Sequence, residues 1–102
     1  MAKLAKYNAV RLPDWIYITG EVLNPNGGSV AATIPSEAEI IEIAARAQDV
    51  YYSINGAFAG PASPGYIVTG SREIIGPLGN LAVLYLYSPA GGYAHIMYFR
   101  QG

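Results

Sequence analysis

Short apolar segments separated by turns rich in glycine and proline run along most of the chain. The segments are rich in Tyr, Ile and Val, the residue types that suit a pleated sheet. Regularly spaced turns, with no long segment free of helix breakers after the middle of the chain, are typical of a sandwich or barrel. The pattern predicts strands at residues 15–23, 29–34, 49–54, 66–69, 72–75, 80–88 and 93–100.

The segment that follows the second of these strands fits two structures. Residues 36–39 have the form of a helix-capping box and good helix formers follow them, so local propensity favours a helix over residues 37–47. The same chain also fits a strand over residues 39–44, in which the apolar alternation is broken and a bulge or a fully covered position is required. Tertiary context overrides helix propensity, and we expect the strand, partly because of the family resemblance given below.

Two late strands have no polar face. In residues 81–87 and 93–99, both sets of alternate side chains are apolar or aromatic, apart from His95. An antiparallel strand that faces water normally alternates apolar and polar residues, so these strands are expected to be covered on both sides. In a domain this small the second cover is most simply another subunit, and tyrosine suits such a contact because its ring packs while its hydroxyl finds a partner. The candidate subunit-interface residues are Trp15, Tyr85, Tyr87, Tyr93 and Tyr98.

The composition also favours an assembled protein. The chain has 102 residues, the length of one domain, and its charged fraction is 13 %, against about 25 % in typical soluble domains. With 52 % hydrophobic residues, a monomer would expose large apolar patches, which usually mark contact surfaces. A net charge of −1 gives no field that attracts nucleic acid or an anionic membrane, and no apolar run is long enough to cross a membrane. We predict an all-β fold, with one small antiparallel β-sandwich over residues 15–102.

Residues 1–14 form a predicted extended N-terminal arm. Its basic residues Lys3, Lys6 and Arg11 lie in the first twelve positions, which contain no acidic residue. Such an arm is either a solvated, frayed terminus or a tether that binds an acidic neighbour. The second alternative makes these three side chains candidate contacts to a larger assembly.

The residues that carry chemistry are sparse. The chain has no cysteine, so disulfides, thiolate metal sites and thiol catalysis are excluded. His95, the one histidine, lies inside an apolar strand and has no second imidazole with which to hold a metal. Two of the three clustered glutamates, Glu37, Glu39 and Glu42, could form an acid pair for glycan hydrolysis, but all three fit a solvated strand edge better. We predict no enzymatic activity, no cofactor and no metal site.

Four stretches of the chain resemble a pattern found in small structural proteins of tailed phages. They are residues 49–57 (DVYYSINGA), 63–67 (SPGYI), 72–81 (REIIGPLGNL) and 94–99 (AHIMYF). In that pattern, a strand that ends in an Asn-Gly-like turn is followed by a Pro-Gly-Tyr element, a Gly-Pro-Leu step and a closing aromatic-rich strand. The resemblance covers residues 29–100. Its motifs are turns and strand fillers, so it transfers no catalytic residue.

The resemblance implies a jelly-roll-like β-sandwich that serves as a capsid decoration, or cement, protein, a class whose members are commonly trimers at local symmetry axes of the shell. On this hypothesis the chain is made in the host cytoplasm and forms a homotrimer on the capsid surface. There it would stabilise the head by contacting the major capsid protein or another virion protein, with the basic arm reaching the shell. A second hypothesis is a tail or fibre module that binds a host receptor or glycan through Tyr51, Tyr52 and Tyr93.

Overall fold

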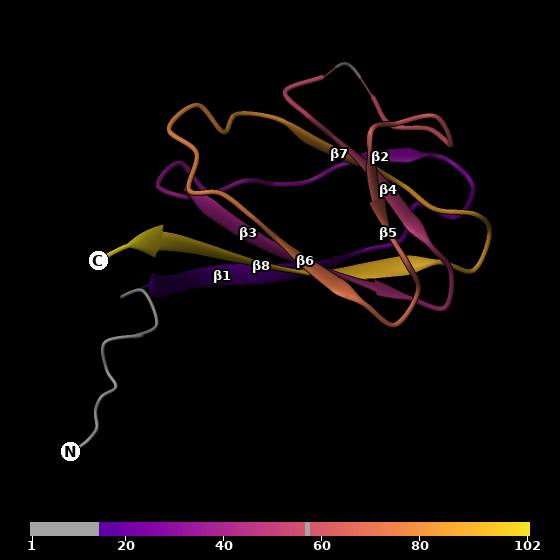
Figure 1. Cartoon of the computed structure of the whole chain (residues 1–102), viewed down its shortest axis with the longest axis horizontal. Coiled ribbons are helices and arrows are strands. Elements are labelled where there is room, and N and C mark those ends of the chain that lie inside the picture. The colour runs from indigo at the N-terminus through magenta and orange to yellow at the C-terminus, as the bar shows by residue number, and fades with distance from the viewer. Residues whose placement is uncertain (1–14, 57) are drawn as a thin grey trace.

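The computed structural model describes residues 15–56 and 58–102, and within these residues the chain is built from eight β-strands without a helix. The strands are β1 (Trp15–Leu23), β2 (Ser29–Ala31), β3 (Ile40–Arg46), β4 (Val50–Ile54), β5 (Gly65–Ile67), β6 (Arg72–Ile75), β7 (Leu84–Tyr87) and β8 (Tyr93–Gln101). Figure 1 shows their arrangement, in which β1 and β8 run side by side along the longest axis. The predicted all-β fold is therefore confirmed.

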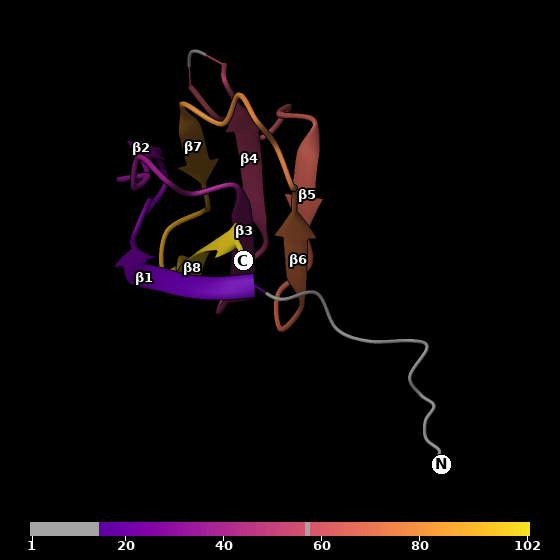
Figure 2. The same ribbon diagram turned by 90° about the vertical axis from the view of Figure 1, so that its left-hand side faces the viewer.

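The strands form two four-stranded antiparallel sheets. Sheet A has the order β1-β8-β3-β6, and sheet B has the order β2-β7-β4-β5. The pairing is nested along the chain, because β1 pairs with β8, β2 with β7, β3 with β6 and β4 with β5. Figure 2 shows the two layers, with sheet B in the upper part of the view and sheet A in the lower part. The architecture is that of a small β-sandwich.

The observed strands follow the predicted ones closely in place and less closely in length. The first strand and the strand at Arg72–Ile75 have the predicted bounds, whereas β2 and β7 are shorter than the predicted segments 29–34 and 80–88. The trimmed ends run through turns and loop hydrogen bonds, such as the one from the Ala32 amide to the Leu84 carbonyl. Strand propensity therefore located the elements, and sheet pairing set where they end.

Residues 40–46 form a strand, although local propensity also favours a helix there. In this strand, Ile41, Ile43 and Ala45 point into the space between the sheets and have no exposed surface. β3 pairs with β8 along residues 40–46 on one side and with β6 along residues 41–44 on the other, so it is a central strand of sheet A. Ile40 faces outward but is also fully covered, which accounts for the break in alternation.

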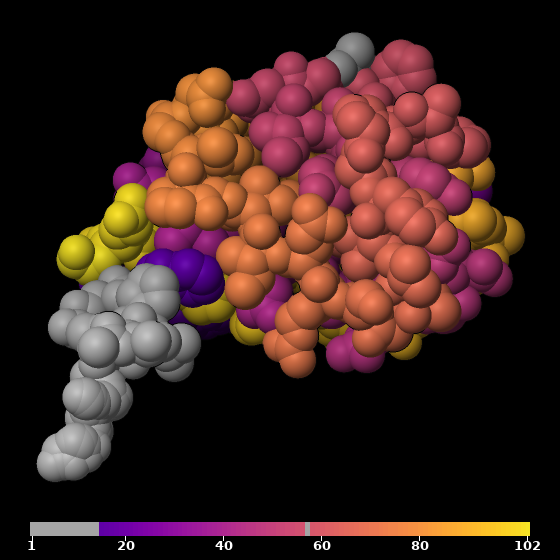
Figure 3. Space-filling view, in the orientation of Figure 1, coloured from indigo at the N-terminus to yellow at the C-terminus, as the bar shows by residue number. Residues whose placement is uncertain are grey.

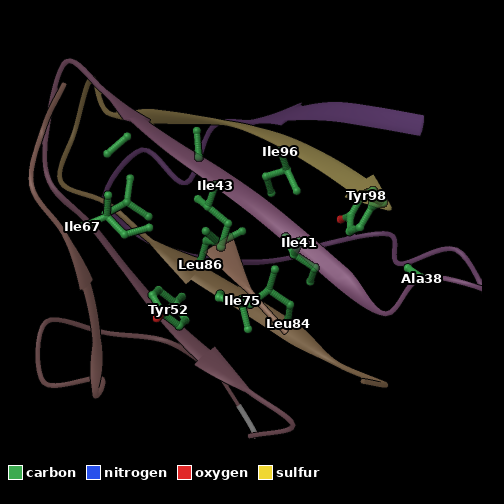
Figure 4. Close-up of a cluster of buried hydrophobic side chains, with 13 residues drawn as sticks. Ala38, Ile41, Ile43, Tyr52, Ile67, Ile75, Leu84, Leu86, Ile96 and Tyr98 are labelled. Carbon is green, nitrogen blue, oxygen red and sulfur yellow. The ribbon is translucent and has the colours of Figure 1, made fainter. Parts of the chain in front are cut away.

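Apolar side chains from both sheets fill one core. Figure 4 shows this cluster, in which Ile41, Ile43 and Ile96 of sheet A lie opposite Leu84 and Leu86 of sheet B. All five side chains are at most 1 % exposed. In Figure 3, the residues of β5, β6 and the segment before β7, in salmon and orange, cover most of this side of the molecule. Burial of alternate residues in each strand thus produces the two-layer fold.

Two buried tyrosines pair with glutamates on the edge strands of sheet A. The Tyr98 hydroxyl donates to the Glu21 carboxylate of β1, and the Tyr52 hydroxyl donates to Glu73 of β6 at 2.6 Å. The Tyr52 ring packs over Gly65 so closely that an added Cβ would lie 2.5 Å from it. Burial, the hydrogen bond and the nearby carboxylate raise the pKa of both phenols, with burial the largest cause. Inward-pointing charges of this kind also prevent edge strands from pairing with other chains.

Candidate interaction surfaces

The outer face of sheet B carries a row of tyrosines. Tyr51 of β4 lies between Tyr66 of β5 and Tyr87 of β7, because the register places each of these residues opposite it. The ring centroids of Tyr51 and Tyr66 are 5.1 Å apart, and those of Tyr51 and Tyr87 are 5.9 Å apart. Tyr85, opposite Ser53, extends the same face by one more outward position. The result is an aromatic surface, called here the tyrosine face (Tyr51, Tyr66, Tyr85 and Tyr87).

Asp49 holds one end of the tyrosine face in place. Its carboxylate accepts hydrogen bonds from the Tyr66 hydroxyl and from the Thr69 amide, each at 2.8 Å. The hydrogen bond to Asp49 is the main reason that the pKa of Tyr66 lies above its ordinary value, and desolvation and the carboxylate charge act in the same direction. Tyr66 is nevertheless 49 % exposed, so its ring is fixed in orientation yet open to a partner.

The outer face of sheet A has an aromatic cluster at one end. The Phe99 ring of β8 lies between Trp15, at a centroid distance of 5.7 Å, and Tyr17, at 5.9 Å. A register shift between Tyr17 and Thr19 gives β1 an extra residue at this point. Tyr17 is 56 % exposed, although its ring packs edge-on against Phe99.

A shallow hollow of about 430 Å³ lies next to this cluster on the same face of sheet A. It is lined by residues of four neighbouring strands: Gly20, Glu21 and Val22 of β1, His95, Ile96 and Met97 of β8, Glu42, Ala44 and Arg46 of β3, and Arg72 of β6. Gly20 and Ala44 form low points because their side chains are small. A Cβ added at Gly20 would lie 2.8 Å from the Ile96 carbonyl oxygen, so only glycine fits there.

Charged side chains of both signs line the hollow, Glu21 and Glu42 against Arg46 and Arg72. The Arg72 guanidinium forms an ion pair with the Glu42 carboxylate at 2.7 Å. In the register of β6 and β3, Arg72 lies opposite Ala44, two residues along β3 from Glu42. Arg46 is exposed and has no acidic partner among the residues that the structure describes. His95 packs against Tyr93 with the ring centroids 5.6 Å apart and stays exposed. The hollow therefore combines an apolar floor with a rim that carries both acidic and basic side chains.

The predicted interface residues lie in three different parts of the structure: the outer face of sheet A, the outer face of sheet B and the core. Trp15 and Tyr93 lie on the outer face of sheet A, and Tyr85 and Tyr87 lie on the outer face of sheet B. Tyr98 has no exposed surface, so its place is in the core of the protomer and not on a subunit contact. The predicted arm contacts at positions 3, 6 and 11 lie outside the described residues. The five interface candidates therefore do not form one patch.

The predicted glycan-stacking tyrosines and the three candidate glutamates also lie in different parts of the fold. Of the proposed glycan-stacking tyrosines, only Tyr51 lies on the tyrosine face, while Tyr52 points into the core and Tyr93 belongs to sheet A. Glu37 and Glu39 lie at one end of the sandwich, whereas Glu42 is on the outer face of sheet A, paired with Arg72. Within the described residues, no group of three or more potential ligands could hold a metal ion.

Sequence reasoning did not identify the hollow. Its members come from four strands that are far apart along the chain, and no local pattern states which outward residues become neighbours. The useful signal was the small residue in an otherwise bulky strand, at Gly20 and at Ala44, because such positions often mark close approach.

The comparisons with known proteins give no identity for this chain. No family model, no curated protein and no solved structure matches it. In the described part of the chain, no helix is long and apolar enough to cross a membrane.

Proposed function

We propose that this chain is a structural protein of a phage virion, most simply a capsid decoration protein that stabilises the head shell. The observation that carries the proposal is the apolar and aromatic surface on both outer faces of a small sandwich. Tyr17, Val22 and Met97 on sheet A are 56 %, 50 % and 38 % exposed, and Tyr66 on sheet B is 49 % exposed. Surfaces of this kind mark contacts in an assembly.

The nested strand pairing supports a jelly-roll topology for this proposal. Folding a long hairpin so that β1–β8, β2–β7, β3–β6 and β4–β5 pair in turn gives the two observed strand orders. Eight-stranded double-sheet folds of this topology occur in viral capsid proteins and also in lectins and cupins. The topology therefore fits a virion protein without selecting it, since one fold serves many functions.

In the proposed assembly, the chain is a homotrimer on the capsid surface. A threefold ring joins two different patches of each subunit, and the outer faces of the two sheets provide different patches. The remaining apolar surface, together with the basic arm at Lys3, Lys6 and Arg11, would contact the major capsid protein or another virion protein. The proposal needs no catalytic residue, cofactor or nucleic acid.

Light scattering after gel filtration tests the oligomer. We expect a defined oligomer, most simply a trimer, at micromolar concentration. The double variant Tyr85→Ser and Tyr87→Ser removes half of the tyrosine face, and Tyr17→Ser removes an exposed ring on the outer face of sheet A. Because both faces join subunits in the proposed ring, each variant should shift the chain toward the monomer. A stable monomeric wild-type chain would contradict the assembly proposal. Labelling of intact particles with an antibody must then show many copies distributed over the head.

A tail or fibre module that binds a host glycan is the second candidate. The row formed by Tyr66, Tyr51 and Tyr87 favours it, because sugar rings stack on exposed aromatic side chains. Particle labelling separates the two candidates, since a few copies at a vertex or on the tail would support adsorption. Loss of glycan binding in Tyr66→Ser, with the oligomer unchanged, would add to that conclusion.

A further inference from the structure

We propose that Asn26 is a site of spontaneous covalent modification in the folded chain, whereas the similar residue Asn55 is kept unreactive by its contacts. The chain contains two Asn-Gly pairs, Asn26–Gly27 and Asn55–Gly56. In such a pair, the glycine has no side chain to hinder the attack of its backbone nitrogen on the preceding side-chain amide. The inference is independent of the proposed function, because it concerns a reaction of the chain with itself and with water.

The reaction joins the glycine nitrogen to the side-chain carbonyl carbon of the asparagine. The nitrogen gives up its proton, the bond from that carbon to the side-chain nitrogen breaks, and ammonia leaves, so that a succinimide ring forms. Water then opens the ring at one of its two carbonyl carbons. One opening gives aspartate, and the other gives isoaspartate, whose main chain is one carbon atom longer. Either product adds one negative charge to a chain of net charge −1.

Exposure and backbone conformation do not distinguish the two pairs. Asn26 and Asn55 are both exposed, so water reaches both. Their φ angles are 50° and 56°, so both residues have the same left-handed conformation. In each pair the side chain must turn toward the glycine nitrogen before the ring can close. The difference between the two pairs therefore lies in the hydrogen bonds that oppose this movement.

Asn55 is fixed through its side chain and its backbone. Its Oδ1 accepts hydrogen bonds from the amides of Ala82 and Val83, each at 3.0 Å, and its Nδ2 donates to the Asn80 carbonyl at 2.9 Å. Its backbone amide also donates to the Val83 carbonyl at 2.7 Å. The side-chain bonds hold one planar group, so they must break together before this group can reach the Gly56 nitrogen. Each of them lowers the population of the open state by about twofold to tenfold.

Asn26 is held less firmly. Its Oδ1 accepts one hydrogen bond, from the Gly91 amide at 3.3 Å, which is longer than an ordinary hydrogen bond of this kind. The attacking nitrogen, that of Gly27, donates to the Ser88 carbonyl at 2.7 Å. These two bonds involve different groups and can open one at a time. We therefore expect Asn26 to react about tenfold faster than Asn55 in the folded chain.

The modification acts on the contact between two turns. The bonds from Gly27 to Ser88 and from Gly91 to Asn26 join the turn after β1 to the turn before β8. The additional main-chain atom of isoaspartate moves Gly27 away from Ser88 and breaks the shorter bond. Hydrogen exchange of the Gly27 amide should consequently be faster in the modified fraction than in the fresh protein.

Peptide mapping by mass spectrometry tests the proposal on the full wild-type chain. The protein is incubated at mildly alkaline pH, which favours loss of the glycine amide proton, with and without guanidinium chloride. In the folded chain, Asn26 should react about tenfold faster than Asn55, and in denaturant the two rates should agree within about twofold. Faster reaction at Asn55 in the folded chain would overturn the proposal, because the amides at its Oδ1 would then act as an oxyanion hole. Absence of reaction at Asn26 until the chain is denatured would overturn it equally.

A variant at Ala82 tests whether the contacts of Asn55 are the cause. Ala82→Pro removes one amide donor to Asn55, so the folded variant should react at Asn55 about twofold to tenfold faster than the wild type. Ala82→Ser is the matched control, because it changes the same exposed side chain and keeps the amide. Circular dichroism establishes that both variants fold, and the comparison of the two pairs in the wild type depends on neither. An unchanged rate at Asn55 in folded Ala82→Pro would contradict the proposed protection.

Discussion

The two sheets contribute alike to the core and differ on the surface. Most inward residues of both sheets are aliphatic and buried, as Ile43 in sheet A and Leu86 in sheet B illustrate. Outward, sheet B presents the tyrosine face, whose hydroxyls suit a polar contact, whereas sheet A presents a hollow with charged side chains at its rim. The inward side chains are alike because both sheets must exclude water from the core. The outward side chains differ because each sheet has its own contacts.

The difference extends to the edges of the sheets. β1 and β6, the edges of sheet A, each turn a glutamate inward to a tyrosine hydroxyl. β2 and β5, the edges of sheet B, have only three residues each. Short strands and inward charges are two ways to prevent edge-to-edge aggregation. The exposed outer faces, and not the edges, are therefore the surfaces available for specific assembly.

Core truncation gives the largest expected effect and tests whether the two sheets share one core. Ile43→Ala and Leu86→Ala should each lower the free energy of unfolding by about 2–5 kcal/mol, because both leave a cavity between the sheets. Urea unfolding followed by circular dichroism measures the loss. Ile74→Ala, at a residue 49 % exposed on the outer face of sheet A, is the control and should cost much less. A large loss in only one of the two core variants would show that the sheets are stabilised separately.

The core was largely predictable from the sequence, whereas the surfaces were not. Alternation in residues 81–87 placed Leu84 and Leu86 on one face and Tyr85 and Tyr87 on the other, as the structure has them. The same alternation could not say which face of the last strand points inward, because both faces are apolar. Tyr98 was consequently assigned to an interface although it lies in the core.

The hollow and the tyrosine face depend on strand order and register. Tyr66 lies beside Tyr51, and Ala44 beside Arg72, because β5 pairs with β4 and β6 pairs with β3. A register shift of one residue would turn every side chain to the opposite face, and the sequence of a single strand does not fix it. The candidate site therefore emerges only from the assembled sheets.

Removal of the two tyrosine–glutamate hydrogen bonds should have the next largest effect on stability. The Tyr98–Glu21 pair lies within sheet A, whereas the Tyr52–Glu73 pair joins sheet B to sheet A. Tyr52→Phe and Tyr98→Phe should each destabilise the fold by about 1–3 kcal/mol, because a carboxylate loses a buried donor. The loss should be larger for Tyr52→Phe. Glu21 keeps a second hydrogen bond from the Thr33 amide at 2.8 Å, whereas Glu73 has no other donor among the described residues. Chemical denaturation at pH 7 measures both values, and a larger loss in Tyr98→Phe would reverse this ranking.

Alkaline pH should weaken the fold through these same phenols. Both have a pKa above the ordinary value of 10.0, so above pH 10 the unfolded chain releases protons that the folded chain retains. Stability is complete below that pH and falls above it, by up to about 1.4 kcal/mol per pH unit for each tyrosine. Unfolding measured between pH 8 and about pH 11 should show the decline. It should be shallower in each Phe variant, and an unchanged slope in both would show that these phenols are not the cause.

The ion pair on the outer face of sheet A should have the smallest effect. Glu42→Gln removes the 2.7 Å contact to Arg72, whose side chain is 69 % exposed, so the cost should stay below about 1 kcal/mol and diminish in high salt. Urea unfolding at low and high salt measures it. A small value would show that this exposed ion pair contributes little to the stability of the fold. A cost as large as that of Ile43→Ala would instead make this face part of the structural framework, and the contrast between the inside and the outside of sheet A would disappear.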